Sequence, residues 1–204
     1  MSLRSKCDRA VVAYLQSKGV CQNIYPALYS LPRALPNVTV LCHSGRREVP
    51  LTGNYRFQLR NRVENSAVIQ PIPAAPGGQP LPPANTDIQR LQIDAATEAV
   101  YIAMMGATQI QNGTYVYDEN SLKATAQAIT SAGRALAVDA SNGADPAQVQ
   151  RAKNNADMVD FTILALYETG LDGGNPKHAD GASDVTFWAE DLLFEIEACD
   201  SNVD

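Results

Sequence analysis

The sequence predicts an α+β fold in which a mixed or antiparallel sheet of about four strands packs on helices. Two strand-like segments lie within the first 65 residues, and two more follow residue 160. The apolar residues of the long stretch between the two pairs show helical spacing, which indicates a helical insertion between two hairpins. A length of 204 residues suits one domain with insertions, so we expect a single domain, 1–204.

The first expected helix covers residues 3–18, where apolar residues recur on one helical face. They are Leu3, Cys7, Ala10, Val11, Tyr14 and Leu15. Gly19 follows at once, and a glycine in that place commonly ends a helix with left-handed backbone angles. Prolines then recur as far as Pro36, which indicates an irregular link to the first strand.

A β-hairpin is expected next. Residues 38–44 are rich in β-branched side chains and stop at Gly45, which predicts a strand, and residues 46–53 are typical of a turn-rich connection. In residues 55–65 the side chains alternate in character. Tyr55, Phe57, Leu59 and Val63 share one face, while Arg56, Arg60 and Arg62 share the other. This period of two predicts a second strand, paired with the first.

The arginine stripe, Arg56, Arg60 and Arg62, is the candidate functional feature of this hairpin. Three like charges on one strand face repel each other, so we expect opposite charge beside them. The acidic C-terminal strand supplies that charge, either within the same chain or across an interface. Because guanidinium groups pair well with carboxylates and phosphates, we expect a subunit contact or a face toward a polyanion. A water-facing strand surface is the simpler alternative.

The middle of the chain opens with a proline-rich loop at residues 70–85, which holds six prolines and two glycines. Such a composition favours an extended segment without regular structure. Thr86 and Asp87 then cap an expected helix whose buried side carries Ile88, Leu91, Ala95, Ala99, Ile102 and Met105. Residues 113–117 are expected to be extended.

Two further helices are expected before the last strands. The first covers residues 121–138, with Leu122, Ala126, Ile129, Gly133 and Leu136 in register. The second starts at Asp145 and Pro146 and runs into the mid-150s, because proline suits the first helical position after an N-cap. Residues 106–157 therefore form the insertion, and residues 1–105 and 158–200 form the core.

The C-terminal part of the chain is expected to return to the sheet. Residues 161–167 are apolar throughout, which favours a strand buried on both faces. Residues 170–183 are rich in Gly and Asp and are interpreted as an exposed loop. From Trp188 to Ala198 apolar and acidic residues alternate, which predicts a final strand, although an amphipathic helix also fits Trp188, Leu192 and Ile196.

Charge is unevenly distributed along the chain, whose net charge is −6. Residues 1–65 hold ten Lys or Arg against three acidic residues, a net charge of +7, and the other 139 residues carry −13. Such asymmetry favours association, either of the basic third with nucleic acid or of one copy with the next. Self-association is the preferred interpretation, because no Lys/Arg-rich run with interleaved aromatic residues is present.

Composition excludes several other classes of protein. An apolar fraction of 45% argues against a disordered chain, and no apolar run reaches the roughly 18–20 residues of a membrane-spanning helix. The charged N-terminus lacks the apolar stretch of a secretion signal, so we expect synthesis in the cytoplasm. Cys7, Cys21, Cys42 and Cys199 form no C-x-x-C pair and are expected to be reduced and mostly buried.

The sequence offers no recognisable catalytic, cofactor or metal site. It contains no phosphate-binding loop, no dinucleotide fingerprint, no H-E-x-x-H and no G-x-S-x-G. His43 neighbours Cys42, but adjacent strand residues point to opposite faces and do not readily share a metal. His178 is expected to be solvated, and the acidic loop from Asp172 to Asp184 does not match EF-hand spacing. We therefore expect a protein that is not an enzyme.

Three segments carry a resemblance to a known family. They are Pro-Asn-Val-Thr-Val at 36–40, Leu-Thr-Gly-Asn-Tyr-Arg-Phe-Gln-Leu-Arg-Asn-Arg-Val-Glu-Asn-Ser-Ala at 51–67, and Val-Thr-Phe-Trp-Ala-Glu-Asp-Leu at 185–192. Together with the N-terminal helix and the helix after the proline-rich break, they resemble the tail terminator proteins of long-tailed bacteriophages, also called tail completion or minor tail proteins. The resemblance covers residues 1–105 and 158–200, and residues 106–157 are longer and more helical than the usual connection of that family.

The resemblance implies a structural virion protein of the tail and neck, assembled in the host cytoplasm. Such proteins form a ring, typically of six copies, on the head-proximal end of the tail tube. The ring stops tube growth and presents the surface that joins the head. The expected partners are further copies of the chain, the tail tube protein and a head-completion or neck protein, with DNA passing the lumen. No catalytic residue or cofactor is implied, and the arginine stripe would face a neighbour or the lumen.

Alternatives remain open at the level of sequence. Another head–tail joining protein or a tube-related protein belongs to the same structural class. A cytosolic enzyme or small-ligand binder belongs to a different class and has no motif to support it. A nucleic-acid-binding module is supported by the basic first third of the chain alone.

Overall fold

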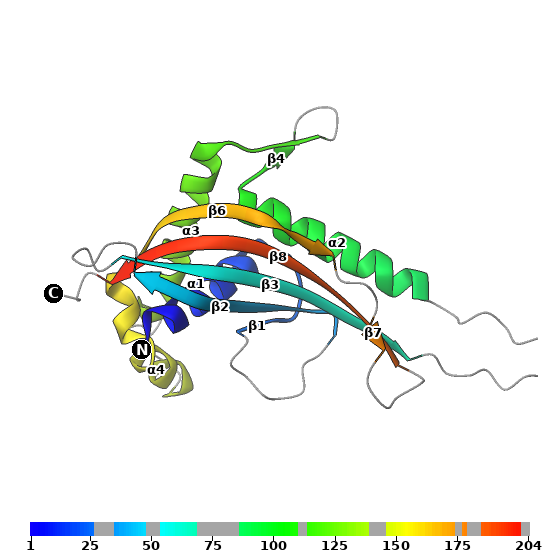
Figure 1. The fold of residues 1–204 in the computed structure, drawn as a ribbon. Helices are drawn as coiled ribbons and strands as arrows, with labels where there is room; N and C mark the ends of the chain where they lie inside the picture. The colour runs from blue at the N-terminus through cyan, green and yellow to red at the C-terminus, as the bar shows by residue number, and fades with distance from the viewer. Residues whose placement is uncertain are drawn as a thin grey trace, which may run out of the picture.

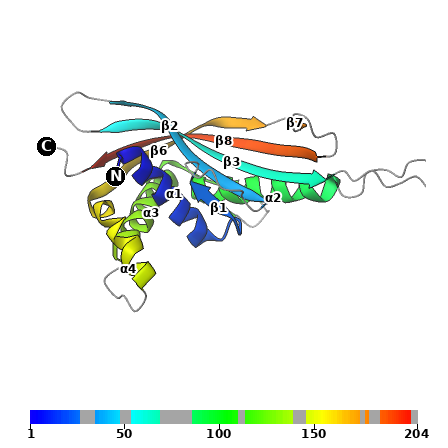
Figure 2. The same ribbon diagram turned by 90° about the horizontal axis from the view of Figure 1, so that it is seen from below.

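Six strands form a mixed, curved sheet in the computed structural model, more than the four or so that the sequence predicts, and the helices lie on one face of it (Figures 1 and 2). The structure describes residues 1–26, 35–47, 54–68, 86–109, 114–138, 146–173, 177–178 and 185–200. The predicted class, α+β with a sheet packed on helices, is confirmed.

The elements follow one another in an order close to the expected one. The helices are α1 (Leu3–Lys18), α2 (Thr86–Met105), α3 (Glu119–Val138), α4 (Pro146–Lys153) and the 3₁₀ turn η1 (Ala156–Asp160). The sheet contains β1 (Ile24–Pro26), β2 (Asn37–Arg47), β3 (Tyr55–Val68), β6 (Phe161–Gly173), β7 (Lys177–His178) and β8 (Val185–Asp200). A separate two-stranded ribbon consists of β4 (Thr108–Gln109) and β5 (Tyr115–Val116).

The strand order is β1-β2-β3-β8-β6, and the short β7 also pairs with β8. The hairpins β2–β3 and β6–β8 join where β3 and β8 run antiparallel, from Tyr55 opposite Ala198 to Val68 opposite Val185. This pairing confirms that the C-terminal segment is a strand rather than a helix. Strand β1, which lies parallel to β2, was not predicted, because three residues ending in a proline are too short to show alternation.

Helix α1 has the predicted bounds, and both of its ends are capped. The Ser2 hydroxyl accepts a hydrogen bond from the Ser5 backbone N–H at 3.3 Å. Gly19 adopts a φ of 64° and donates its N–H to the Gln16 carbonyl at 3.1 Å. These contacts satisfy backbone groups that have no partner within the helix, so the local sequence alone defines where α1 begins and ends.

Helix α3 is part of the core although it lies in the predicted insertion. Ala126 and Ile129 are buried in the same hydrophobic cluster as the strands, as the predicted register of this helix requires. Gly133 lies where α3 crosses α1, and a Cβ added there would come within 2.8 Å of the Ala10 Cβ. The crossing is therefore too close for any side chain larger than that of glycine.

The buried side of α2 differs from the predicted one. Of the predicted residues, Met105 is fully buried, but Leu91 is 65% exposed and Ala95 is also exposed. The helix packs instead through Ile93, Val100 and Met104. Apolar residues occupy more than one side of this helix, so their spacing fits two orientations, and packing on the sheet selects one.

Strand β6 is exposed on one side, so the prediction of a strand buried on both faces was wrong. Leu164 is 42% exposed and Tyr167 is 41% exposed. The strand lies at the sheet edge, where it pairs with β8 alone among the described strands, and two register shifts interrupt the pairing. Bulges of this kind turn side chains away from the core and are frequent at sheet edges.

The bounds of other elements also differ from the predicted ones. Strand β2 continues to Arg47, past a register shift between His43 and Arg46, where a turn was expected. The glycine-rich segment expected as a loop begins inside β6, and His178 lies in β7. The proline-rich loop at 70–85 and most of residues 174–184 lie outside the described residues.

A buried carboxylate, Asp8, connects α1 to β2. Its Oδ1 accepts a hydrogen bond from the Cys42 backbone N–H at 2.6 Å, and its Oδ2 has no hydrogen-bond partner among the described residues. Burial raises the pKa of Asp8 above its ordinary value, against the opposing effects of the Cys42 hydrogen bonds and the charge of Arg4. The folded chain therefore holds a proton on this group more tightly than the unfolded chain does.

We expect the pH dependence of stability to reveal this group. Above the unfolded carboxyl pKa of about 4, the wild type should lose free energy of unfolding until the pH exceeds the raised pKa of the folded state. The asparagine side chain of the Asp8→Asn variant does not ionise, so the variant lacks this loss. The free energy of unfolding of the variant should therefore rise relative to that of the wild type over this pH range. Urea titrations of both proteins at several pH values measure the difference, and parallel pH profiles would contradict the expectation.

Candidate functional site

The face of the sheet opposite the helices is the candidate functional site, and we call it the open face. In Figure 2 helices α1 to α4 lie below the sheet, and no described helix covers its other side. Alternate residues of β3 and β8 divide between the two faces: Leu59 and Phe194 are buried toward the helices, whereas Arg60 and Glu195 are half-buried on the open face. The alternation predicted for residues 55–65 is confirmed.

The arginine stripe lies on the open face beside the carboxylates of β8. Arg62 makes two hydrogen bonds to Asp191, from Nε at 2.8 Å and from Nη2 at 3.0 Å, and also contacts Glu64 at 3.8 Å. Arg56 lies 3.5 Å from Glu195 and 3.6 Å from Glu197. The negative charge that the sequence analysis expected beside the stripe is therefore present within the same chain.

Arg60 is paired more weakly than its two neighbours. Strand register places Arg62 opposite Asp191 and Arg56 opposite Glu197, but it places Arg60 opposite Leu193. The nearest carboxylate lies diagonally across the strands, and Arg60 Nε is 3.7 Å from Asp191 Oδ2. Diagonal neighbours in an antiparallel pair are more distant than direct ones, which explains the difference among the three arginines.

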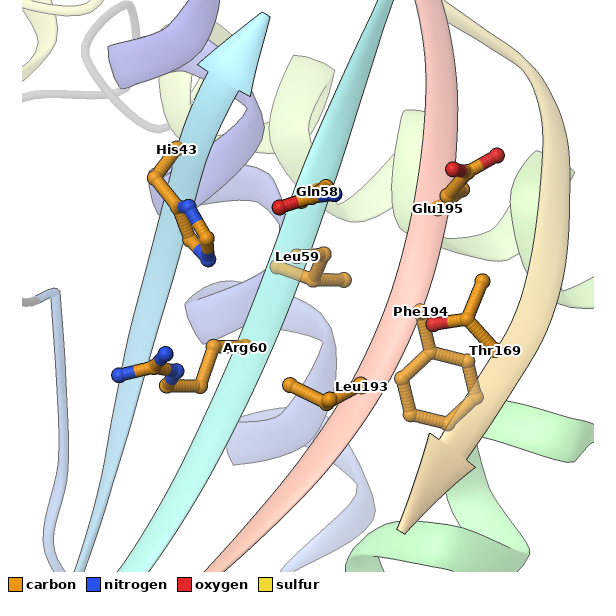
Figure 3. A pocket seen from close by; sticks show the side chains of 8 residues that line it. All are labelled: His43, Gln58, Leu59, Arg60, Thr169, Leu193, Phe194 and Glu195. Carbon is orange, nitrogen blue, oxygen red and sulfur yellow. The ribbon is translucent and has the colours of Figure 1, made fainter. Parts of the chain in front are cut away.

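A shallow hollow of about 270 Å³ lies beside Arg60 on the open face. Figure 3 shows the Arg60 guanidinium reaching over β2 on the side of the His43 ring, with Leu193 on β8 and Thr169 on β6 across from them. The lining residues are His43, Gln58, Leu59, Arg60, Thr169, Leu193, Phe194 and Glu195. The hollow is therefore lined by both polar and apolar residues.

His43 and Cys42 occupy opposite faces of β2, as predicted. The Cys42 thiol is fully buried toward the helices, where burial raises its pKa well above the ordinary value, with Cys7 and Asp8 adding to the effect. His43 lines the open-face hollow. All four cysteines are free thiols, of which Cys7 and Cys42 are buried and Cys21 and Cys199 are half-buried.

A tyrosine cluster joins the β4–β5 ribbon to the sheet edge, and no sequence pattern pointed to it. The Tyr101 hydroxyl donates to Glu168 Oε1 at 3.1 Å, and the Tyr117 hydroxyl donates to Glu168 Oε2 at 3.3 Å. Burial together with the Tyr117 and Glu168 neighbours raises the pKa of Tyr101. These residues are 16 to 67 positions apart in sequence, and spacing patterns detect neighbours within one element.

A second groove, of about 480 Å³, lies between the C-terminal ends of α1 and α2. Its walls are mostly small or apolar residues, including Ala99, Ile102 and Gly106. Lys18 is the charged residue in its lining, and the Tyr14 hydroxyl is already occupied in a hydrogen bond to the Ala103 carbonyl at 2.7 Å. The groove therefore offers few polar groups to orient a ligand.

The described residues contain no cluster of three or more His, Cys, Asp or Glu side chains placed to hold a metal ion. Within the same part of the chain, no helix has the length and apolar character needed to span a membrane. The side chains of Asp172 and His178 and the residues Asp180 and Asp184 lie outside what the structure describes.

No protein-family model matches the chain. No curated protein sequence matches it either.

Proposed function

We propose that this protein is a tail terminator of a long-tailed bacteriophage. In this proposal it is a structural protein without catalytic activity, and copies of it form a ring, expected to be a hexamer, on the head-proximal end of the tail tube. The ring ends tube growth and presents the surface that a neck or head-completion protein binds. The support comes from the resemblance at residues 36–40, 51–67 and 185–192 and from the character of the open face.

The open face is the observation that carries this proposal. Its charged side chains pair with one another along β3 and β8 and do not converge on one point, as the polar groups of a small-molecule site do. The hollow of about 270 Å³ is slightly below the usual volume range of ligand pockets, roughly 300–1,000 Å³. A broad surface with apolar patches and internally paired charges suits contact with another protein surface.

The alternatives predict different behaviour in solution. Another head–tail joining protein or a tube-related protein would use the same kind of surface but bind a different part of the particle. A small-ligand binder would use the groove between α1 and α2 and would not require self-association. A nucleic-acid-binding module would bind DNA with a steep dependence on salt.

The mass of the purified protein, alone and with assembled tail tubes, tests the proposal. We expect light scattering and negative-stain imaging to reveal a ring, or a monomer that becomes a ring at one end of each tube. Binding along the tube wall would favour a tube-related protein instead. A monomer that does not bind tube ends would contradict the proposal.

A further inference from the structure

Arg60 is the least satisfied charge of the open face. Its Nε is buried without a hydrogen-bond partner in the described part of the chain, and its ion-pair contact there is the 3.7 Å approach to Asp191. Both oxygens of Asp191 already accept hydrogen bonds from Arg62. The Arg60 side chain is 36% exposed, and the hollow beside it has room for an additional acceptor.

The chemistry around Arg60 favours a single carboxylate as that acceptor. Arginine binds carboxylates and phosphates with paired hydrogen bonds, so both groups fit its fork of donors. Among the side chains that the structure describes on β3 and β8, however, Arg56, Arg60 and Arg62 lie beside four carboxylates, those of Glu64, Asp191, Glu195 and Glu197. These carboxylates repel a polyanion such as DNA, which presents one charge per roughly 1.7 Å, whereas a single carboxylate can pair with Arg60.

A second surface of the molecule presents a carboxylate beside apolar side chains. The exposed fractions of Tyr115, Val116 and Tyr117 are 36%, 45% and 46%, and these residues lead into Glu119 at the start of α3. The Glu119 side chain is 83% exposed and contacts Lys123 at 3.0 Å. An exposed i,i+4 pair of this kind contributes only about 0.3–0.5 kcal/mol, so Glu119 can exchange this partner at little cost.

The ribbon that carries these residues lies beyond the β6 edge of the sheet (Figure 1). Successive residues of a strand point to opposite sides, so Tyr115 and Val116 expose apolar groups on both sides of the ribbon. A two-stranded ribbon is marginally stable by itself, and large apolar groups exposed together mark contact sites. Apolar groups are also accessible on the open face. Leu193 lines the hollow, and the exposed Tyr167 on β6 lies directly opposite Glu195, which also lines the hollow.

We propose that the segment from Tyr115 to Glu119 of one copy binds the open face of the next copy. Glu119 pairs with Arg60, and the aromatic and apolar side chains of the ribbon pack near Leu193 and Tyr167. The two surfaces are different parts of the chain, so the contact is head-to-tail, and it closes into a ring if the rotation between copies allows. This assignment rests on the proposed function, because it names the subunit contact of the ring.

A charge exchange tests the pairing. We expect Arg60→Glu and Glu119→Arg each to weaken self-association, on tube ends or in solution, by about tenfold, because each places like charges together. The double variant restores the pair with reversed polarity and should associate within about threefold of the wild type. Sedimentation velocity and the fraction of capped tubes measure both effects. Reversal of Arg56 or Arg62 is unsuitable, since each lies directly opposite a carboxylate of its own chain in the β3–β8 register, whereas Arg60 lies opposite Leu193.

Matched controls separate this contact from general charge effects. Glu98→Arg on α2 and Lys153→Glu on α4 alter exposed charges away from both surfaces and should leave association unchanged. Equal melting temperatures exclude misfolding as the cause. A photoreactive benzoylphenylalanine at Val116 should cross-link to peptides of β3, β6 or β8 of another copy.

The outcomes of these experiments test the proposed subunit contact and the proposed ring function separately. Rings that form normally in both single variants, or a double variant that fails to recover, would overturn the contact and leave the ring function standing. A wild type that never associates, even with tube ends, would overturn both. Binding of duplex DNA at physiological salt that Arg60→Glu abolishes would assign Arg60 to nucleic acid instead.

Discussion

Replacing Gly133 by valine should destabilise the fold by about 3 kcal/mol, at the upper end of the usual cost of overpacking a core. A Cβ at this position would lie 2.8 Å from the Ala10 Cβ, 3.1 Å from Met158 Cε and 3.4 Å from Phe161 Cδ1. Side chains from α1, η1 and β6 thus surround the site, and the α1–α3 crossing must widen to accept a branched residue. Thermal unfolding should show a melting temperature lowered by roughly 6–12 °C.

The control is Ala135→Val on the same helix. Ala135 is exposed, so this substitution changes helix propensity by a few tenths of a kcal/mol and leaves the crossing untouched. The melting temperature of Gly133→Ala should lie between those of Gly133→Val and Ala135→Val. The alanine increases helix propensity but still places a Cβ against Ala10. Equal melting temperatures for Gly133→Val and Ala135→Val would show that the crossing adapts without cost.

Removing the buried charge of Lys6 should also cost about 3 kcal/mol of unfolding free energy. The Lys6 side chain is 3% exposed, and its Nζ forms an ion pair with Asp200 Oδ2, which joins α1 to the last residue of β8. Asp200 is 13% exposed, and its Oδ1 has no hydrogen-bond partner among the described residues. In Lys6→Met this carboxylate remains in a poorly hydrated site without its counter-charge, and urea denaturation measures the loss.

The double variant Lys6→Met/Asp200→Leu provides the control. Replacing a buried ion pair by apolar residues of similar size is often neutral, so we expect stability to return to within about 1 kcal/mol of the wild type. If the double variant were no more stable than Lys6→Met, packing rather than the unpaired charge would explain the loss.

The arginine stripe illustrates how far sequence reasoning reaches in this protein. The alternation of residues 55–65 placed Arg56, Arg60 and Arg62 on one strand face, and the structure confirms it. The alternation says nothing of the strand beside it. Whether each arginine has a carboxylate opposite depends on the register between β3 and β8, whose paired residues are more than 100 positions apart. Arg60 was a candidate from the sequence, but its difference from Arg56 and Arg62 follows from that register.

In the core, helix α2 and strand β6 show likewise that local sequence patterns do not determine how an element packs. Apolar residues identified both elements, but the predicted buried side of α2 included the exposed Leu91 and Ala95, and β6 was predicted to be buried on both faces. Ile93 is buried and Leu91 is exposed because α2 lies on the sheet in one particular rotation. Tyr167 is exposed because β6 occupies the edge of the sheet, and order within a sheet is a property of the whole chain.

The sequence by itself determined the fold class, the bounds of α1 and the two faces of β3. Each depends on contacts between residues a few positions apart, whose spacing is fixed by the geometry of a helix or a strand. The tertiary structure decided the strand order, the neighbours of each arginine, the close crossing at Gly133 and the exposure of the β4–β5 ribbon. These depend on distant segments meeting, and register and packing select one arrangement among several that the local patterns allow.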